Sequence, residues 1–84
     1  MKHGDIVKTN REFLGEPPGT LCYVYEEYNN GVSVITQSGV DLGGFSGHEL
    51  NYLEFVKESG FLYPFKNVMQ LDWDFKEKIL PVFN

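Results

Sequence analysis

The sequence predicts a mainly β fold, a small barrel of about five short strands with one or two short helices in its C-terminal half. Residues 20–28 and 32–37 are rich in the aromatic and β-branched side chains that suit a pleated sheet. Glycine- and proline-containing turn signals separate these runs. The chain has only 84 residues, so we expect one domain, residues 1–84, whose short sheet curls to protect its edges.

The first two strands are predicted on either side of a long loop. Residues 4–9 form the first strand, and residues 15–19 end it, because two prolines there lack amide donors and two glycines tolerate positive φ. Residues 20–28 form the second strand, with apolar side chains on both faces. Leu21, Tyr23 and Tyr25 share one face, and Cys22, Val24 and Tyr28 share the other. We expect such a strand to bend within a barrel.

Two tight turns predict a meander after the second strand. Asn30-Gly31 tolerates positive φ at both central positions of a type I′ hairpin turn. Residues 32–37 then form the returning strand, and residues 38–39 make the next turn. Residues 40–45 form a further strand, in which adjacent glycines predict a bulge or a close backbone approach.

Residues 47–58 fit two structures. Ser46 and Glu49 match a capping box, and Leu50, Leu53 and Val56 recur at helical spacing. This pattern favours a short helix that ends at residues 59–60. The alternative is one helical turn followed by a strand over residues 52–56.

Residues 61–84 predict short elements only. Pro64 makes residues 61–65 an extended segment, and residues 68–71 are predicted to form a last short strand. A closing helical turn is expected over residues 73–79. Asp72 would cap this turn and Pro81 would end it.

These elements resemble the SH3-like small β-barrels, in particular small uncharacterised bacterial domains of this shape. The resemblance rests on the Gly4-Asp5-Ile6-Val7 entry strand, the long loop ending in Pro18-Gly19, the strand that begins at Gly19-Thr20, and the strand over residues 32–37. It covers residues 4–46 and implies a fold but no ligand, because one fold hosts many functions. The Ala-Leu-Tyr-Asp-Tyr signature of modules that bind proline-rich peptides is absent from this sequence.

The charge balance argues against nucleic-acid binding. Twelve acidic residues oppose seven basic ones, and the formal net charge of −5 is spread over both halves of the chain. Nucleic-acid affinity comes mainly from cations that neutralise phosphates. An RNA-binding barrel is therefore an alternative only if Lys2, Lys8, Arg11 and Lys66 converge on one face.

The remaining composition predicts no membrane, metal or cofactor role. No apolar run is long enough to span a bilayer. Cys22 is the single cysteine, and we expect it to be a buried hydrophobic residue; without paired cysteines or an apolar leader, the cytoplasm is the expected location. The two histidines lie 45 positions apart, which gives no zinc pattern, so no cofactor is predicted.

Ser46 and His48 define one enzymatic alternative. Residues 44–48 come near the Gly-x-Ser-x-Gly pattern of a nucleophile elbow, but His48 replaces the last glycine. A small hydrolase-like or ligand-binding protein centred on these two residues is thus a second hypothesis. The alternative, which we favour, is that Ser46 caps a helix and His48 faces solvent.

A surplus of aromatic residues favours a binding role. Phe13, Tyr28 and Trp73 lie in polar surroundings, and with Glu26 they are the candidate binding residues of an acidic contact surface. The alternative is that Trp73 plugs one barrel end and Phe13 folds back over the other. Glu26 and Glu27 are expected on opposite faces of their strand, so they would not act as a pair. The sequence predicts a non-enzymatic interaction module that docks a basic protein partner.

Overall fold

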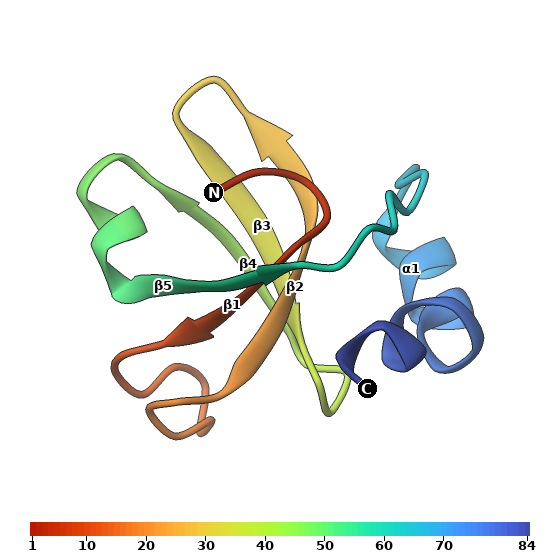
Figure 1. The fold of residues 1–84 in the computed structure, drawn as a ribbon, viewed down its shortest axis with the longest axis horizontal. Helices are drawn as coiled ribbons and strands as arrows, with labels where there is room; N and C mark the ends of the chain where they lie inside the picture. Colours follow the sequence, from red (N-terminus) through yellow and green to blue (C-terminus); the bar gives the residue numbers. More distant parts are fainter.

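The computed structural model describes residues 1–84, and its centre is one five-stranded antiparallel sheet (Figure 1). The strand order is β4-β3-β2-β1-β5. The strands are β1 (Asp5–Thr9), β2 (Leu21–Tyr28), β3 (Gly31–Thr36), β4 (Asp41–Ser46) and β5 (Leu53–Glu58). The prediction of a mainly β fold is confirmed, and the first four strands lie within one residue of their predicted positions.

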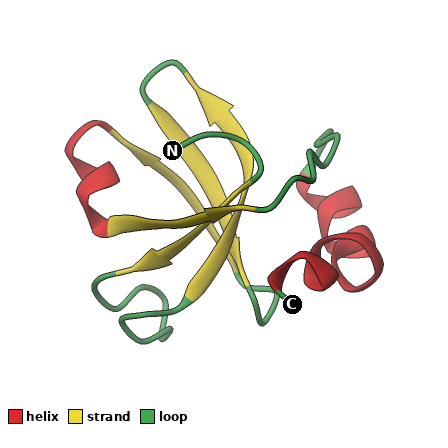
Figure 2. Cartoon of the chain, viewed as in Figure 1, coloured by secondary structure: helices red, strands yellow, loops and turns green.

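Helical turns occupy two places. A 3₁₀ turn, η1 (Gly47–Tyr52), connects β4 to β5. At the C-terminus, α1 (Val68–Asp74), η2 (Phe75–Ile79) and η3 (Leu80–Phe83) follow one another and lie together beside the sheet (Figure 2). None of the helical segments has the length and hydropathy that a bilayer crossing requires.

The central strand β2 bends, as its two apolar faces predicted. Val24 pairs with Val34 and Glu26 pairs with Ser33, so Tyr25 is an extra residue in the ladder, a β-bulge. Such a bulge bends the strand and increases its local twist. Before the bulge, the side chains of β2 alternate between the two faces of the sheet, as predicted.

The two faces of the sheet are buried in two separate clusters. The inner cluster lies where the sheet curls on itself and consists of Val7, Cys22, Val24, Val32, Val34, Phe45 and Leu53. The helix-side cluster consists of Ile6, Tyr23, Tyr25, Ile35, Tyr63, Leu71, Ile79 and Phe83. Because both faces are apolar, the sheet needs both its own curvature and the C-terminal helical segment to exclude water.

Cys22 belongs to the inner cluster, as predicted. Its side chain is fully buried, and this burial raises the pKa of the thiol to about 12. Since the thiolate is the reactive form, the buried thiol is inert in the folded protein.

The predicted helix over residues 47–58 is wrong, and the alternative is confirmed. Only the 3₁₀ turn η1 is helical, and β5 then pairs with β1 from Thr9↔Leu53 to Asp5↔Glu58. Val56 has no partner in the register, which skips from Phe55 to Lys57. The helical spacing of the apolar residues was misleading because an otherwise unpaired edge of β1 was available to this segment.

The predicted strand over residues 68–71 is also wrong, because α1 begins there. Asn67 caps this helix, with its Oδ1 accepting a 2.8 Å hydrogen bond from the Gln70 amide. Asp72 therefore lies inside the helix and is not its cap. Pro81 does not end the helical segment either, because it lies at the start of η3, where a missing amide donor costs no hydrogen bond.

Candidate functional site

An open hollow of about 560 Å³ lies at the end of β2, beside the N-terminal turn and the segment that follows β5. Aromatic side chains and carboxylates line it together. The residues that matter below are His3, Tyr25, Glu26, Glu27, Tyr28 and Phe65. We call this feature the Tyr28 hollow.

Glu26 and Glu27 line the same hollow, although a regular strand would place them on opposite faces. No contact joins their two carboxylates, and the expectation that they do not act as a pair stays a prediction. The bulge at Tyr25 precedes both residues, and the register from Glu26 to Tyr28 is unbroken, so the hollow reaches both of them where the strand ends. Two adjacent acidic residues therefore line one hollow.

Each of the two carboxylates is held by this chain at one oxygen only. The Tyr28 hydroxyl donates to Glu26 Oε1 at 3.0 Å and also hydrogen-bonds the Ser33 hydroxyl. The His3 amide donates to Glu27 Oε1 at 3.0 Å. The second oxygen of each carboxylate has no hydrogen-bond partner in the protein.

No cation of the chain neutralises these two acids. The ion pairs are Lys2–Glu58 at 3.3 Å, Lys8–Glu54 at 3.9 Å and Lys78–Asp74 at 3.6 Å. Glu26 and Glu27 take part in none of them. The hollow therefore presents fixed negative charge that the fold leaves unpaired.

The phenol of Tyr25 acts as a hydrogen-bond donor. It donates to both oxygens of Asp41, at 2.9 and 3.0 Å. Burial, with the Asp41 carboxylate, raises the pKa of Tyr25 above its usual value, so the phenol stays protonated at neutral pH. It is not a base or a nucleophile under those conditions.

The four predicted binding residues do not form one site. Tyr28, which is 43% exposed, and the half-buried Glu26 meet in the Tyr28 hollow. Phe13 packs instead on the inner cluster, with its ring 5.0 Å from that of Phe45 in a T-shaped contact. Phe13 thus follows the alternative given above, in which it folds back over the barrel and does not line a contact surface. Trp73 is 82% exposed on α1, so it does not plug a barrel end, and it does not line the hollow.

The sequence did not single out Glu27, Tyr25, Phe65 or His3. A signal for the first two was present in the run Tyr25-Glu26-Glu27-Tyr28, which alternates rings and carboxylates at the end of a strand. No local pattern could have found His3 and Phe65, because they reach the hollow from distant parts of the chain.

Ser46 and His48 do not form a nucleophile–base pair. The Ser46 amide donates to Glu49 Oε1 at 3.2 Å, which is the predicted capping geometry. His48 is exposed, and its ring lies edge-on to that of Tyr52 at 6.2 Å. No hydrogen bond joins the serine to the histidine.

Three of the four cations required for an RNA-binding face make contacts with other side chains of the protein. Lys2 and Lys8 each pair with a glutamate of β5. The guanidinium carbon of Arg11 lies 3.8 Å from the centre of the Tyr52 ring, a cation–π contact. Acidic partners beside the lysines weaken any attraction for phosphate.

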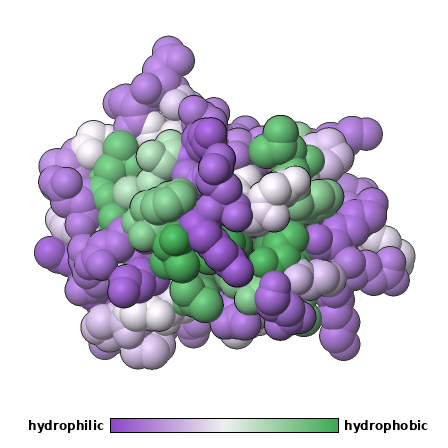
Figure 3. Space-filling model, in the orientation of Figure 1, coloured by the Kyte–Doolittle hydropathy of each residue, from purple (hydrophilic) through white to green (hydrophobic).

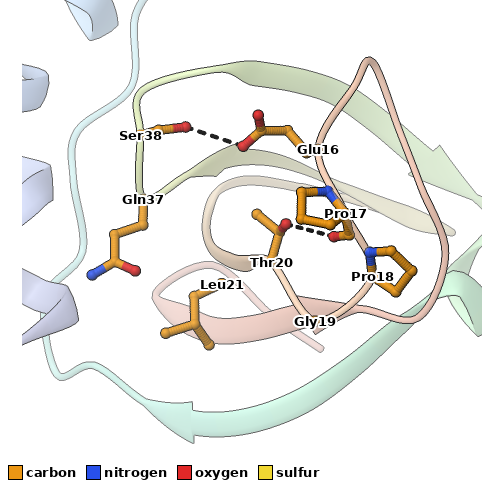
Figure 4. A pocket seen from close by; sticks show the side chains of 8 residues that line it. All are labelled: Glu16, Pro17, Pro18, Gly19, Thr20, Leu21, Gln37 and Ser38. Atoms are coloured by element: carbon orange, nitrogen blue, oxygen red, sulfur yellow. Dashed lines mark hydrogen bonds between the residues drawn. The ribbon is translucent and has the colours of Figure 1, made fainter.

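A second hollow, of about 480 Å³, lies between the long loop and the β3–β4 turn (Figure 4). Two pairs of its polar groups already bond to one another. Ser38 donates to Glu16 Oε1 at 3.1 Å, and the Thr20 hydroxyl donates to the Pro17 carbonyl at 2.6 Å. Its apolar side chains are those of Pro17, Pro18 and Leu21, and Glu16 is its one charged residue. This hollow therefore offers less for a ligand to bind than the Tyr28 hollow.

No family model, curated protein or solved structure matches this chain at a significant level. No group of three or more His, Cys, Asp or Glu side chains comes together in a way that could hold a metal ion. What the Tyr28 hollow can bind therefore follows from its own residues.

Exposed apolar side chains also occur away from the hollow. Met69 and Trp73 are the most exposed and lie one helical turn apart on α1. Figure 3 shows hydrophobic side chains (green) in separate areas of one face, divided by hydrophilic ones (purple). Scattered exposure of this kind is normal on a protein surface and does not define a site.

Proposed function

We propose that this protein is a non-enzymatic interaction module that docks a basic protein partner at the Tyr28 hollow. One observation carries the proposal: Glu26 and Glu27 line an aromatic hollow, and each is held in place by this chain while no lysine or arginine neutralises it. Carboxylates that are already fixed lose little side-chain entropy when a cation binds. The net charge of −5 adds long-range attraction for a basic partner.

We further propose that the barrel is SH3-like and that the protein works in a reducing compartment such as the cytoplasm. Support for the first point comes from the strand order, with β1 between β2 and β5, and from the long loop that separates β1 from β2. Support for the second comes from the single, buried cysteine, which forms no disulfide.

Affinity capture with matched variants tests the proposed function. The double variant Glu26→Gln/Glu27→Gln removes both carboxylate charges of the hollow. The control Glu12→Gln/Glu77→Gln removes the same charge from two exposed residues that do not line the hollow. We expect a partner of net positive charge that the wild type and the control retain, and that the hollow variant binds about tenfold more weakly or worse.

Added salt should weaken this binding, because charge attraction between surfaces is screened. A partner held equally by the hollow variant, a partner of acidic character, or no reproducible partner at all would overturn the proposed function.

A further inference from the structure

We infer that the Tyr28 hollow takes the guanidinium group of an arginine that belongs to the partner protein. This inference rests on the proposed function and narrows it to one side chain. Two features of the hollow favour a guanidinium over an ammonium: its rings and the separate anchoring of its two carboxylates.

The rings provide flat apolar surface beside the negative charge. Tyr28 is 43% exposed, and Phe65 is half-buried with its ring 4.8 Å from that of Tyr25. A cation over an aromatic face is attracted by the ring quadrupole. A guanidinium is planar and weakly hydrated, so it also stacks on such rings, whereas an ammonium holds its water more tightly.

The two carboxylates are anchored from different sides. Glu26 is held through the Tyr28 hydroxyl, and Glu27 through the His3 amide. Each carboxylate keeps one oxygen free as a hydrogen-bond acceptor. The five donors of a guanidinium spread over a planar fork and can reach two separate acceptors, while an ammonium concentrates its charge at one point.

A neighbouring hollow favours an arginine within a polypeptide over a free small molecule. It has a volume of about 140 Å³ and shares Glu27, Tyr28 and Asn29 with the Tyr28 hollow. Val32 and Leu50 are among its other lining residues. A chain that places arginine in the larger hollow could thus continue past Tyr28 with an apolar residue.

A comparison of two small probes tests the inference. N-acetyl-arginine methylamide and N-acetyl-lysine methylamide are titrated into the ¹⁵N-labelled protein, and amide shifts are followed by NMR. We expect the arginine probe to shift the amides of Glu26, Glu27, Tyr28 and Phe65 and to bind at least about threefold more tightly than the lysine probe. Equal or tighter lysine binding, shifts confined to other residues, or no shifts with either probe would overturn it.

Two substitutions at Tyr28 separate the ring from its hydroxyl. Tyr28→Leu removes both the aromatic face and the hydroxyl that anchors Glu26, and it should abolish the preference for arginine, whereas Tyr28→Phe loses only the hydroxyl and should keep part of the preference. The opposite pattern contradicts the inference. If Tyr28→Leu disturbs the whole spectrum, Glu26→Gln/Glu27→Gln serves in its place, and it should lower arginine binding while Glu12→Gln/Glu77→Gln leaves it unchanged.

The two proposals fail in distinguishable ways. A partner that depends on Glu26 and Glu27, together with equal binding of both probes, would overturn only the choice of arginine. The absence of any such partner would overturn the proposed function, whichever probe binds.

Discussion

The hydroxyl of Tyr63 donates a 2.6 Å hydrogen bond to Oδ2 of Asp74, and both side chains are buried. The Tyr63 amide in turn donates to the Tyr23 hydroxyl at 3.0 Å, and that hydroxyl donates to the Phe61 carbonyl at 2.6 Å. Gln70 adds a second donor to Asp74 at 3.0 Å. This network ties the C-terminal helical segment to β2 and so keeps the helix-side cluster covered.

Tyr63→Phe should lower the melting temperature. The substitution keeps the ring but removes the hydroxyl, which leaves Asp74 without its shortest hydrogen bond. For a domain of this size we expect a fall in Tm of about 4–8 °C, measured by circular dichroism. Tyr52→Phe is the control, because the Tyr52 hydroxyl makes no hydrogen bond in the protein. Equal shifts in the two variants would show that the Tyr63–Asp74 bond adds no stability.

Acid should weaken the docking of the C-terminal segment. The hydrogen bonds from Tyr63 and Gln70 hold the pKa of Asp74 below its ordinary value of 3.8, and Lys78 adds to this effect. Because the folded-state pKa is the lower one, the stabilisation is fully present above the unfolded value and is lost as the pH falls through the folded-state pKa. Urea unfolding below about pH 4 should show this loss, and Asp74→Asn should reduce its pH dependence. Asp72→Asn, which changes an exposed neighbouring residue, should leave this pH dependence in place.

Trp73 should contribute little to folding. Its side chain is 82% exposed, so Trp73→Ala should change the free energy of unfolding by no more than about 0.5 kcal/mol. Leu71→Ala, two residues earlier and fully buried, should cost about 2–5 kcal/mol. Trp73 is the only tryptophan, so its fluorescence should change little on unfolding and should be quenched by iodide in the native state. A protected tryptophan would contradict the exposed position.

Gly31 should tolerate no side chain. A Cβ atom built there would collide with the Phe45 carbonyl oxygen and would lie 2.9 Å from Ser46 Cα, both of which belong to the backbone of β4. Gly31→Ala should therefore destabilise the protein by about 1–3 kcal/mol in urea unfolding. Gly44→Ala is the matched control in the same hairpin, because its nearest new contact is an ordinary 3.7 Å from the Ser33 hydroxyl. A similar loss in both variants would mean that the close approach at Gly31 is not the cause.

Local patterns were sufficient to predict the first half of the fold. The two prolines before Gly19 limit where the chain can turn, and the apolar residues of β2 alternate on both faces. The hairpin turn lies near Asn30-Gly31 as predicted, but the predicted type I′ turn is wrong: Asn29 and Asn30 form the turn, Gly31 begins β3, and neither Asn30 nor Gly31 has a positive φ. These signals depend on φ preferences and on side-chain direction, which are properties of neighbouring residues. The buried position of Cys22 followed from the same pattern.

The second half of the fold depends on contacts between residues that are distant in the sequence. Leu53 and Val56 have a spacing that a helix also accepts, and the pairing of β5 with β1 decided for a strand. Val68 and Leu71 have side chains that suit a strand, and the Asn67 cap, together with the burial of Leu71 and Ile79 on the sheet, decided for a helix.

The sequence by itself determined the mainly β class, the first four strands and the net negative charge of the chain. Only the tertiary structure decided that Glu26 and Glu27 share one hollow with Phe65 and His3. The reason is physical: the packing of two distant segments sets which side chains face each other, and this packing leaves no periodic signal in the sequence.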